Sequence, residues 1–509
     1  MNKRLLRIAV VALAAGFVLY RHFGATPDDD SHGGGIAIPA QGGGFTAGTL
    51  DFTPCELPQP HSAATTAAYC APFQVPENWD APDGGRRIAL RLALVPAQDE
   101  VADADIAVLL AGGPGQSAVE SWPQAAPAFA PLRRHRHVLL LDQRGTGGSN
   151  ALSCGQLDED EAVLDPGAIA GRTRDCLARV SQHADPRYYT TGMALRDLEA
   201  VRQALGAPPF DLIGISYGTR VAQQYARAYP EAVRSIVLDS AVPNGEALGA
   251  EFARNLDDAL KAQFAACTAT PACARAYGDP WADLHRLRDA LSAQPVEVAY
   301  RDPVDNARKS LRLDADSLAM LARLYAYMPE TAALLPLAIE QALAGDYAPL
   351  VGQLGLLGRE LESLGDNAMQ LSVLCSEDID RLQPDPADAG TLLGTRLTDA
   401  LRTQCTIWPH GTRTAGFNDA FAGTQPVLVL SGELDPVTPP RYAEAIGKGL
   451  PNARVLVAKG QGHNVIGRGC FPRLVARFLD HPDPAALDAG CVKDFGPVPA
   501  FIDFNGAAP

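Results

Sequence analysis

The chain of 509 residues is 47% hydrophobic and 20% charged, an ordinary globular composition that allows several domains or one large domain with an insertion. Its formal net charge of −16 argues against a nucleic-acid partner, because binding to phosphates requires clustered Lys and Arg side chains. The longest basic block, from Arg133 to His137, is typical of a solvated helix end.

Residues 1–24 have the form of an export signal, in which Lys3, Arg4 and Arg7 precede an apolar run from Ile8 to Tyr20. The run suits the core of a signal peptide better than a full membrane span, yet its end lacks the small residues of a clean cleavage site. We therefore expect a signal peptide or an uncleaved N-terminal membrane anchor. Either one places the rest of the chain outside the cytoplasm, periplasmic or secreted.

The ten cysteines support export independently, since an even number in an exported chain favours disulfides. Metal binding and buried free thiols are the alternatives, but no C-x-x-C motif is present and we expect no metal site. Spacing does not prove the connectivity. We expect neighbours in sequence to pair: Cys55 with Cys70, Cys154 with Cys176, Cys267 with Cys273, Cys375 with Cys405, and Cys470 with Cys491.

Residues 25–48 are rich in Asp, Gly and Pro, and such a segment cannot bury enough apolar surface to become ordered. The sequence therefore predicts a flexible linker here, followed by a folded core whose first part spans residues 49–240. Arg87 to Val95 alternates well enough to predict a strand of this core.

A second predicted strand, Ile106 to Leu110, leads into the glycine-rich loop Ala111 to Ser117. Such a loop lets backbone N–H groups point into a cavity, where two donors can stabilise an oxyanion. In an α/β-hydrolase one donor is the N–H after the nucleophile, here Tyr217, and the other comes from this loop, where Gly113 is the candidate. Pro114 has no N–H, and a simple tight turn is the alternative reading of the loop.

His137 to Leu141 predicts a third strand, which ends in the segment Asp142 to Ser149. This segment resembles a phosphate cradle but lacks the Lys and Ser/Thr of a P-loop, so we expect a structural turn in which Asp142 and Arg144 tie loops together. Met193 to Leu205 then predicts a helix that Gly206 ends.

The next stretch contains a candidate nucleophile. Leu212 to Ile215 predicts a buried strand and Tyr217 to Tyr229 a helix, with the G-x-S-x-G pattern of Gly214 to Gly218 between them. The glycines allow the strand to turn directly into the helix, which exposes the Ser216 hydroxyl at the helix N-terminus. A turn of small residues is the alternative, because so short a pattern also arises by chance.

After a strand at Arg234 to Leu238, the alternation of strands and helices stops, and residues 241–423 are mostly helical in pattern. This excursion is too long for a loop and predicts a helical cap domain inserted into the core. Strands resume at Val427 to Leu430 and at Arg454 to Val457, so residues 424–509 are expected to complete the core.

Each resumed strand ends near a residue with catalytic potential. Ser216, Asp435 and His463 follow the Ser, Asp, His order of the α/β-hydrolases, each after the end of a predicted strand. His463 would remove the proton of Ser216 during attack, and Asp435 would hold the imidazole in the right tautomer. Glu433 is the rival acid, and a turn or loop role is the alternative for Asp435 and His463.

These motifs together resemble the prolyl and tripeptidyl aminopeptidase branch of the α/β-hydrolases, and in particular its exported, cysteine-rich tripeptidyl aminopeptidase-like group. The resemblance extends from about Thr53 to Asp494. It implies a mostly parallel central sheet flanked by helices, with a large helical cap. The matching segments are Gly112 to Gly115, Asp142 to Gly147, Gly214 to Thr219, the Gly-Glu-Leu-Asp that ends at Asp435, and the Gly-His that ends at His463.

The resemblance also implies an activity. Members of this branch are serine exopeptidases that remove short pieces from free peptide N-termini, with cap carboxylates that bind the α-amino group. The matching cap motif is Val373 to Asp378, so Glu377 is the candidate for the amine, with a solvated surface acid as the alternative. Prolyl aminopeptidases usually begin the glycine loop with His, and Ala111 at that position argues against strict prolyl specificity.

Two competing functions remain. A carboxylesterase would use the same triad, and an apolar cap pocket would favour it over a peptidase. A catalytically silent binding protein on this scaffold would be expected to lack one member of the triad. Dehalogenases and epoxide hydrolases carry Asp in place of Ser216, and none of these readings requires a cofactor.

Overall fold

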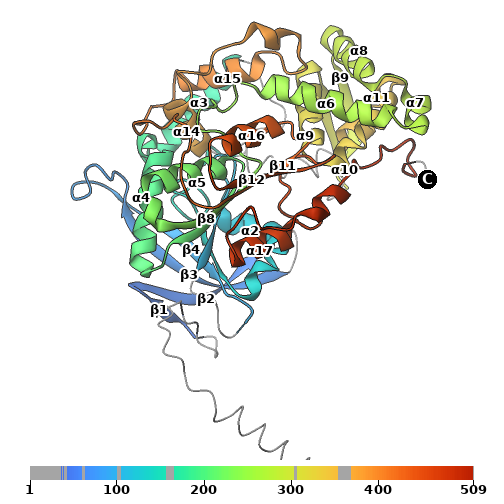
Figure 1. The fold of residues 1–509 in the computed structure, drawn as a ribbon. Coiled ribbons are helices and arrows are strands. Elements are labelled where there is room, and N and C mark those ends of the chain that lie inside the picture. Colours follow the sequence, from blue (N-terminus) through green and yellow to red (C-terminus); the bar gives the residue numbers. More distant parts are fainter. Residues whose placement is uncertain are drawn as a thin grey trace, which may run out of the picture. The chain divides into compact units, whose positions relative to one another are not determined.

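The computed structural model describes residues 43–59, 64–99, 105–155, 166–302, 306–352 and 368–507, together with Ile36 and Ile38 (Figure 1). The predicted signal or anchor at residues 1–24 lies outside the described residues. Within the described ranges, no helix has the length and apolar character needed to cross a membrane.

A ten-stranded sheet forms the centre of the described chain, in the order β1-β2-β3-β4-β6-β5-β7-β8-β11-β12. Pairing is antiparallel from β1 to β6 and parallel from β6 to β12. The strands are β1 (Phe45–Ala47), β2 (Leu50–Pro58), β3 (Thr65–Pro76), β4 (Arg87–Val95), β5 (Ile106–Leu110), β6 (His137–Leu141), β7 (Phe210–Ile215), β8 (Val233–Asp239), β11 (Val427–Gly432) and β12 (Ala453–Ala458).

Helices cover both faces of the parallel part of the sheet, which explains why every residue of β5, β6 and β11 is buried. On one face, side chains of these strands pack with α2 (Ala118–Phe129) and α17 (Phe471–Asp480), which contact each other. The other face packs with α4 (Thr191–Leu205), α5 (Tyr217–Ala228) and α16 (Pro440–Lys448). This arrangement confirms the predicted fold class.

The segment predicted as a cap is mainly helical but has two parts. Its first part encloses a hydrophobic cluster of its own and includes the β9–β10 hairpin, which the helical prediction missed. Its elements are α6 (Phe252–Thr268), α7 (Pro271–Tyr277), α8 (Pro280–Ala293), β9 (Val296–Arg301), β10 (Arg308–Leu313), α9 (Ala315–Tyr327), α10 (Pro329–Ala332), α11 (Leu335–Leu343) and α12 (Ala348–Gly352).

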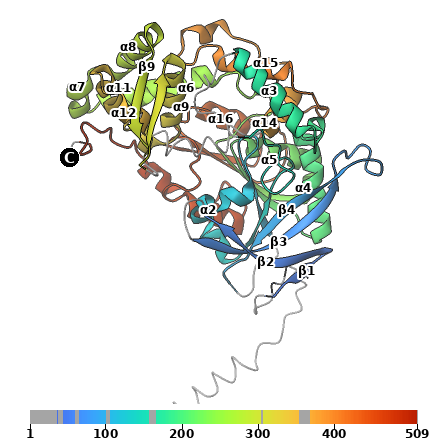
Figure 2. The same cartoon turned by 180° about the vertical axis from the view of Figure 1, so that it is seen from behind.

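The second part of the predicted cap belongs instead to the core cluster. Buried residues of α14 (Ala368–Glu377) and α15 (Arg396–Cys405) pack in the same cluster as the central strands. Figure 2 shows these helices beside α3 (Pro166–Val180), and α15 contacts α3 directly. The chain therefore leaves the core once but returns to it before the final strands.

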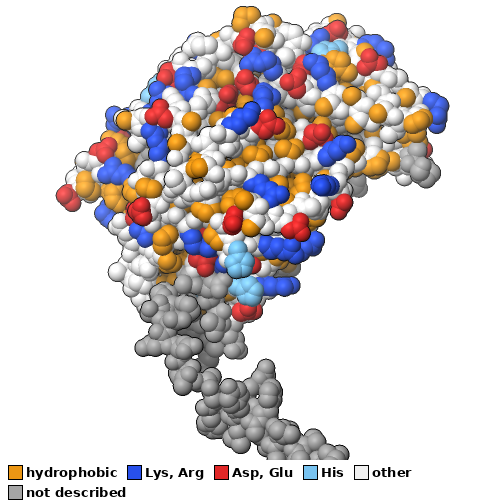
Figure 3. Space-filling view, viewed as in Figure 1, with side chains coloured by type: hydrophobic (Ala, Val, Ile, Leu, Met, Phe, Trp, Pro, Cys, Tyr) orange, Lys and Arg blue, Asp and Glu red, His pale blue; other side chains and the backbone are white. Residues whose placement is uncertain are grey.

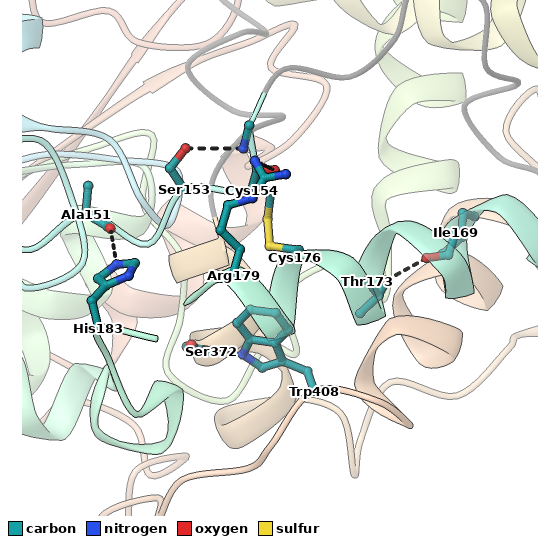
Figure 4. The surroundings of a disulfide bond; sticks show 11 residues. Ala151, Ser153, Cys154, Ile169, Thr173, Cys176, Arg179, His183, Ser372 and Trp408 are labelled. Carbon is teal, nitrogen blue, oxygen red and sulfur yellow. Dashed lines mark hydrogen bonds between the residues drawn. A yellow bond between two sulfur atoms is a disulfide. The ribbon is translucent and has the colours of Figure 1, made fainter. Parts of the chain in front are cut away.

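The ten cysteines form five disulfides, paired between neighbours in sequence as predicted. Cys154–Cys176 joins the segment after β6 to α3, where Arg179 also donates to the carbonyl oxygen of Cys154 over 2.7 Å (Figure 4). Each bond closes a local loop, so the disulfides stabilise individual segments rather than joining the core to the cap.

Two predictions about the first part of the chain are wrong in detail. Strand β1 lies inside the range predicted as linker, because Phe45 stacks on Phe52 with ring centroids 5.2 Å apart. Arg136 is not a solvated side chain: it is 4% exposed and pairs with Asp105 and Asp480.

On the face shown in Figure 3, acidic and basic side chains are interspersed.

The disulfides predict a difference in stability between two loops. Replacing Cys375 and Cys405 by Ser opens a loop with a sequence separation of 30, whereas the same change at Cys267 and Cys273 opens one of 6. In the chain-entropy model the longer loop contributes about 3–4 kcal/mol and the shorter about 2 kcal/mol. We therefore expect a larger fall in Tm for the Cys375/Cys405 variant, measured by calorimetry at one fixed scan rate. An equal or smaller fall would contradict the model.

Candidate active site

Ser216 lies between β7 and α5 in a strained backbone conformation, with φ of 55° and ψ of −120°. Its N–H donates to the carbonyl oxygen of Asp239 over 2.9 Å, which holds this turn against the end of β8. A non-glycine residue at positive φ costs about 1–3 kcal/mol and persists only where the surroundings impose it. Such strain is typical of a nucleophile elbow.

The two glycines of the elbow are required by close backbone contacts. A Cβ atom on Gly218 would lie 2.0 Å from the carbonyl oxygen of Leu110, and one on Gly214 would lie 2.5 Å from that of Gly218. No side chain fits at these separations. The pattern around Ser216 therefore follows from packing between β5, β7 and α5.

The candidate oxyanion loop lies directly against Ser216. A Cβ atom on Gly112 would be 3.2 Å from the Cβ of Ser216, and Gly113 has a φ of 103°, which a side chain would disfavour. Gly113 and Tyr217, the two predicted donors, line the same cavity as Ser216. The structure thus places both residues beside the candidate nucleophile.

The segment after β6 acts as a structural turn, as expected. Asp142 accepts hydrogen bonds from the Ser117 hydroxyl over 2.5 Å and from the Val119 N–H over 3.0 Å, which fastens the start of α2. Arg144 is fully buried and pairs with Asp197 over 2.6 Å. Asp142 thus ties the end of the glycine-rich loop to the start of α2, and Arg144 ties this turn to α4.

Asp435 and His463 form a buried hydrogen-bonded pair. His463 Nδ1 donates to Asp435 Oδ2 over 2.8 Å, while the other carboxylate oxygen accepts the N–H groups of Val437 and Thr438 over 2.8 Å each. Burial alone would raise the pKa of Asp435, but His463 and these hydrogen bonds outweigh it and lower the pKa. An ionised Asp435 leaves His463 Nε2 free to accept a proton.

Glu433, the rival acid, takes a different role. Its carboxylate accepts the N–H of Gly460 over 2.7 Å and so supports the turn before His463. Asp435 is therefore the carboxylate that pairs with His463.

The end of β8 holds both the turn that carries Ser216 and the segment next to His463. Asp239 accepts the Ser216 N–H through its carbonyl oxygen, and the adjacent Ser240 accepts the Asn464 N–H through its hydroxyl over 2.8 Å. Thr438 lines the cavity of Ser216 and also contacts His463 Nδ1 over 3.3 Å. The three triad candidates thus all lie at the carboxyl edge of the sheet, where open α/β sheets place their chemistry.

A model of the alpha/beta hydrolase fold matches residues 107–468. The chain belongs to this family.

Named relatives of this α/β-hydrolase include peptidases and an esterase. The chain is 26% identical to serine protease Hip1 of Mycobacterium tuberculosis, covering 84% of this chain and 88% of the relative. It is 28% identical to carboxylesterase B of Mycobacterium tuberculosis, covering 81% and 84%. It is 24% identical to a tripeptidyl aminopeptidase of Streptomyces coelicolor, covering 76% of each. The protein is thus a serine hydrolase, similar both to peptidases and to an esterase.

Three further residues of this hydrolase form hydrogen bonds that position the candidate triad. Asp239 accepts the N–H groups of Val465 and Ile466 over 3.0 Å each, and burial raises its pKa to about 6. The Thr438 hydroxyl donates to Asp435 over 2.7 Å, and the carbonyl oxygen of Tyr327 accepts the His463 N–H over 2.8 Å. The sequence pattern does not single these residues out. The position of Asp239 at a buried strand end is the one available signal.

Glu377 is buried rather than solvated, so the surface-acid alternative is wrong. Its exposed fraction is 1%, and its two oxygens accept the N–H and the hydroxyl of Thr191 over 2.6 and 2.8 Å. Burial, and then the charge of Asp378, raise its pKa to about 7. Thr191 also forms a hydrogen bond with the Tyr217 hydroxyl over 2.6 Å, so Glu377 holds the Tyr217 side chain in place through Thr191.

The cavity beside Ser216 is lined by two carboxylates, those of Glu246 and Glu251. Glu377 is not among its described lining residues. Both glutamates lie where the chain enters the cap, a position that the sequence motifs do not mark. The remaining lining residues are Gly113, Tyr217, Val242, Ala247, Leu248, Gly249, Phe252, Val437, Thr438 and Tyr442.

The two carboxylates differ in their surroundings. Glu251 accepts hydrogen bonds from the Tyr442 hydroxyl over 2.6 Å and from Arg441 over 2.9 Å, and these outweigh burial and lower its pKa. Burial, and then the charge of Glu251, raise the pKa of Glu246 to about 7. The cavity thus holds one carboxylate, Glu251, that is paired with an arginine, and a second, Glu246, whose nearby positive charge does not offset the effect of burial on its pKa.

Replacing the candidate nucleophile gives a direct prediction. Ser216→Ala removes the attacking oxygen, and we expect kcat to fall by at least about a thousandfold on any substrate, because loss of a triad member removes the chemical step itself. The Tm should stay close to that of the native protein. Ser181→Ala, at an exposed turn after α3, is the matched control and should keep full activity. Activity retained by Ser216→Ala would show that the elbow is not the catalytic centre.

Proposed function

We propose that this serine hydrolase is an exopeptidase that releases short peptides or single residues from free peptide N-termini through an acyl-enzyme on Ser216. The observation that carries the proposal is the pair of carboxylates, Glu246 and Glu251, in the cavity that Ser216 lines. A free N-terminus is an ammonium group, and carboxylates are the side chains that bind it most strongly. A simple ester substrate has no group that needs them.

In the proposed reaction, Ser216 Oγ attacks the peptide carbonyl while His463 Nε2 takes its proton. Asp435 holds the imidazole and stabilises its charged form, and the N–H groups of Gly113 and Tyr217 stabilise the oxyanion. His463 then gives the proton to the leaving amine, and water releases the acyl group by the same steps in reverse order. No metal or cofactor takes part in this scheme.

The proposed amine site is Glu246 with Glu251, in place of Glu377. An ammonium group between the first two would neutralise their mutual repulsion, which is part of what raises the pKa of Glu246. Glu377 already accepts two hydrogen bonds from Thr191 and supports Tyr217. Binding of the substrate N-terminus beside Ser216 would restrict cleavage to the first residues of a peptide.

A carboxylesterase is the second candidate function. The similarity to carboxylesterase B supports it, and so do the apolar lining residues Val242, Leu248 and Phe252, which suit the acyl group of an ester. The triad serves either reaction. The two functions therefore differ in the role of Glu246 and Glu251, which would bind the substrate ammonium group in an exopeptidase and would have no substrate partner in an esterase.

We also propose that the protein acts outside the cytoplasm. The five disulfides support export, because such bonds persist in oxidising compartments. The basic and then apolar start of the sequence supports a signal peptide or a membrane anchor. Detection of the mature N-terminus by mass spectrometry in periplasmic, membrane and medium fractions tests this placement.

A matched pair of substrates tests the exopeptidase proposal. One is a short chromogenic peptide amide with a free N-terminus, and the other is the same peptide with that amine acetylated. We expect kcat/KM to be at least about tenfold higher for the free form, since a charged hydrogen bond contributes roughly 1.5–3 kcal/mol. Equal cleavage of both, or cleavage of simple esters alone, would leave a general serine hydrolase and overturn the proposal.

The raised pKa of Glu246 predicts a pH dependence. Glu246 is ionised above a pH of about 7 and protonated below it, so affinity for an ammonium group should fall as the pH drops through this value. We expect KM for the free peptide to rise on acidification and Glu246→Gln to raise KM and abolish this effect. A simple ester reports the catalytic base alone, and Glu231→Gln, at an exposed site, is the matched control. Identical pH profiles of KM for peptide and ester in the native protein would contradict the assignment.

A further inference from the structure

Arg323, in the cap helix α9, is a buried cation without an anionic partner in the described chain. Its exposed fraction is 7%, and none of the ion pairs among the described residues includes it. One guanidinium nitrogen, Nη2, donates to the Tyr327 hydroxyl over 3.2 Å. The other, Nη1, is buried and has no hydrogen-bond partner.

The other buried arginines of the described chain all have carboxylate partners. Arg144 pairs with Asp197 over 2.6 Å, Arg220 pairs with Asp378 over 2.8 Å, and Arg136 pairs with Asp480 over 2.6 Å. This pattern follows from the high cost of burying a charge without a partner. Arg323 departs from it, and a buried unsatisfied donor of this kind calls for an explanation in terms of a ligand or a function.

Aromatic side chains hold Arg323 between the substrate cavity and the catalytic base. Its Cζ lies 4.5 Å from the ring centroid of Phe252, which lines the cavity of Ser216, and 5.6 Å from that of Tyr327. The Tyr327 ring in turn packs edge-on against the His463 imidazole, with centroids 5.3 Å apart. The two rings stabilise the cation without neutralising it, so its charge remains available to an anion.

We propose that Arg323 binds a carboxylate of the peptide substrate and so determines specificity; this inference rests on the proposed exopeptidase function. A planar guanidinium group can bind a carboxylate through two parallel hydrogen bonds, and Nη1 of Arg323 is a donor that has no partner among the described residues. The carboxylate reaches it when the Phe252 ring, which stands between Arg323 and the cavity, turns aside. The site then binds a substrate through both of its charged groups, with Glu246 and Glu251 on the ammonium and Arg323 on the carboxylate.

Two carboxylates of a peptide have this chemistry, the C-terminal one of a short peptide and the side chain of Asp or Glu near the cleaved bond. Three peptides with the same free N-terminus distinguish them. The first ends in a C-terminal acid, the second in a C-terminal amide, and the third is the amide with Asp in place of an Ala after the cleaved bond. The kcat/KM of each is measured by chromatography of the products.

For the native protein we expect kcat/KM to be about ten- to a hundredfold higher for at least one carboxylate peptide than for the neutral amide, the range expected for a charged hydrogen bond. Preference for the acid identifies the C-terminal carboxylate, and preference for the Asp peptide identifies the side chain. Arg323→Gln should bring the preferred ratio close to one, mainly through KM. Arg286→Gln, at an exposed cap position paired with Asp283, is the matched control and should keep the native ratio.

Equal cleavage of all three peptides by the native protein would overturn the role of Arg323 while leaving the exopeptidase in place. An equal loss on all three peptides in Arg323→Gln would show that Arg323 serves packing alone. Arg323→Lys keeps the charge and decides the question if the Gln variant does not fold, because it should lower the preference only in part. Cleavage of a simple ester but of no peptide would overturn the exopeptidase and this inference with it.

Discussion

The contact between Gly218 and the carbonyl oxygen of Leu110 is the constraint on which the site depends. Because no side chain separates α5 from the end of β5, the loop that follows β5 lies directly against Ser216. Gly112 can then lie so close to the candidate nucleophile that a Cβ atom on it would be 3.2 Å from the Cβ of Ser216. A larger residue at Gly218 would move the loop away, so the position of the candidate oxyanion hole is a consequence of helix-to-strand packing rather than of the loop alone.

The end of β8 positions the segment that carries the candidate base, His463. Asp239 holds the Ser216 backbone through its carbonyl oxygen and the segment after His463 through its carboxyl group. The candidate nucleophile and the candidate base therefore both depend on one buried residue, Asp239, for the position of their backbone. The cap also contacts this segment, because the carbonyl oxygen of Tyr327 accepts the backbone N–H of His463 and the Tyr327 ring packs against the imidazole. A displacement of α9 would therefore move the imidazole.

The sequence predicts those parts of the site that depend on local backbone geometry. The elbow around Ser216, the strand ends that carry Asp435 and His463, and the helix ended by Gly206 each involve neighbouring residues, and each has a recognisable pattern. The order of cysteines likewise sufficed for the disulfides, because each bond closes a local loop.

What the sequence could not predict depends on contacts between distant residues. Glu377 is separated by 186 residues from Thr191, the partner that makes it a structural group, and no local pattern records that contact. Arg136 is buried because it meets Asp480 from the far end of the chain. Glu246 and Glu251 face the cavity only because the chain turns into the cap there. In each case tertiary contact, not residue type, decides whether a charge is solvated, paired or available.

Substrate choice in this α/β-hydrolase is therefore a question about the cap rather than the triad. The core supplies a candidate nucleophile, a candidate base and two candidate oxyanion donors, and this set would serve an ester as well as an amide. The cap supplies the charges near the cavity. They are Glu246, whose pKa is raised by burial and then by the negative charge of Glu251, and Arg323, which has no carboxylate partner in the described chain. A charge without an opposite partner is costly away from bulk water, and in the proposed complex a peptide with both an ammonium and a carboxylate group would supply partners for Glu246 and Arg323.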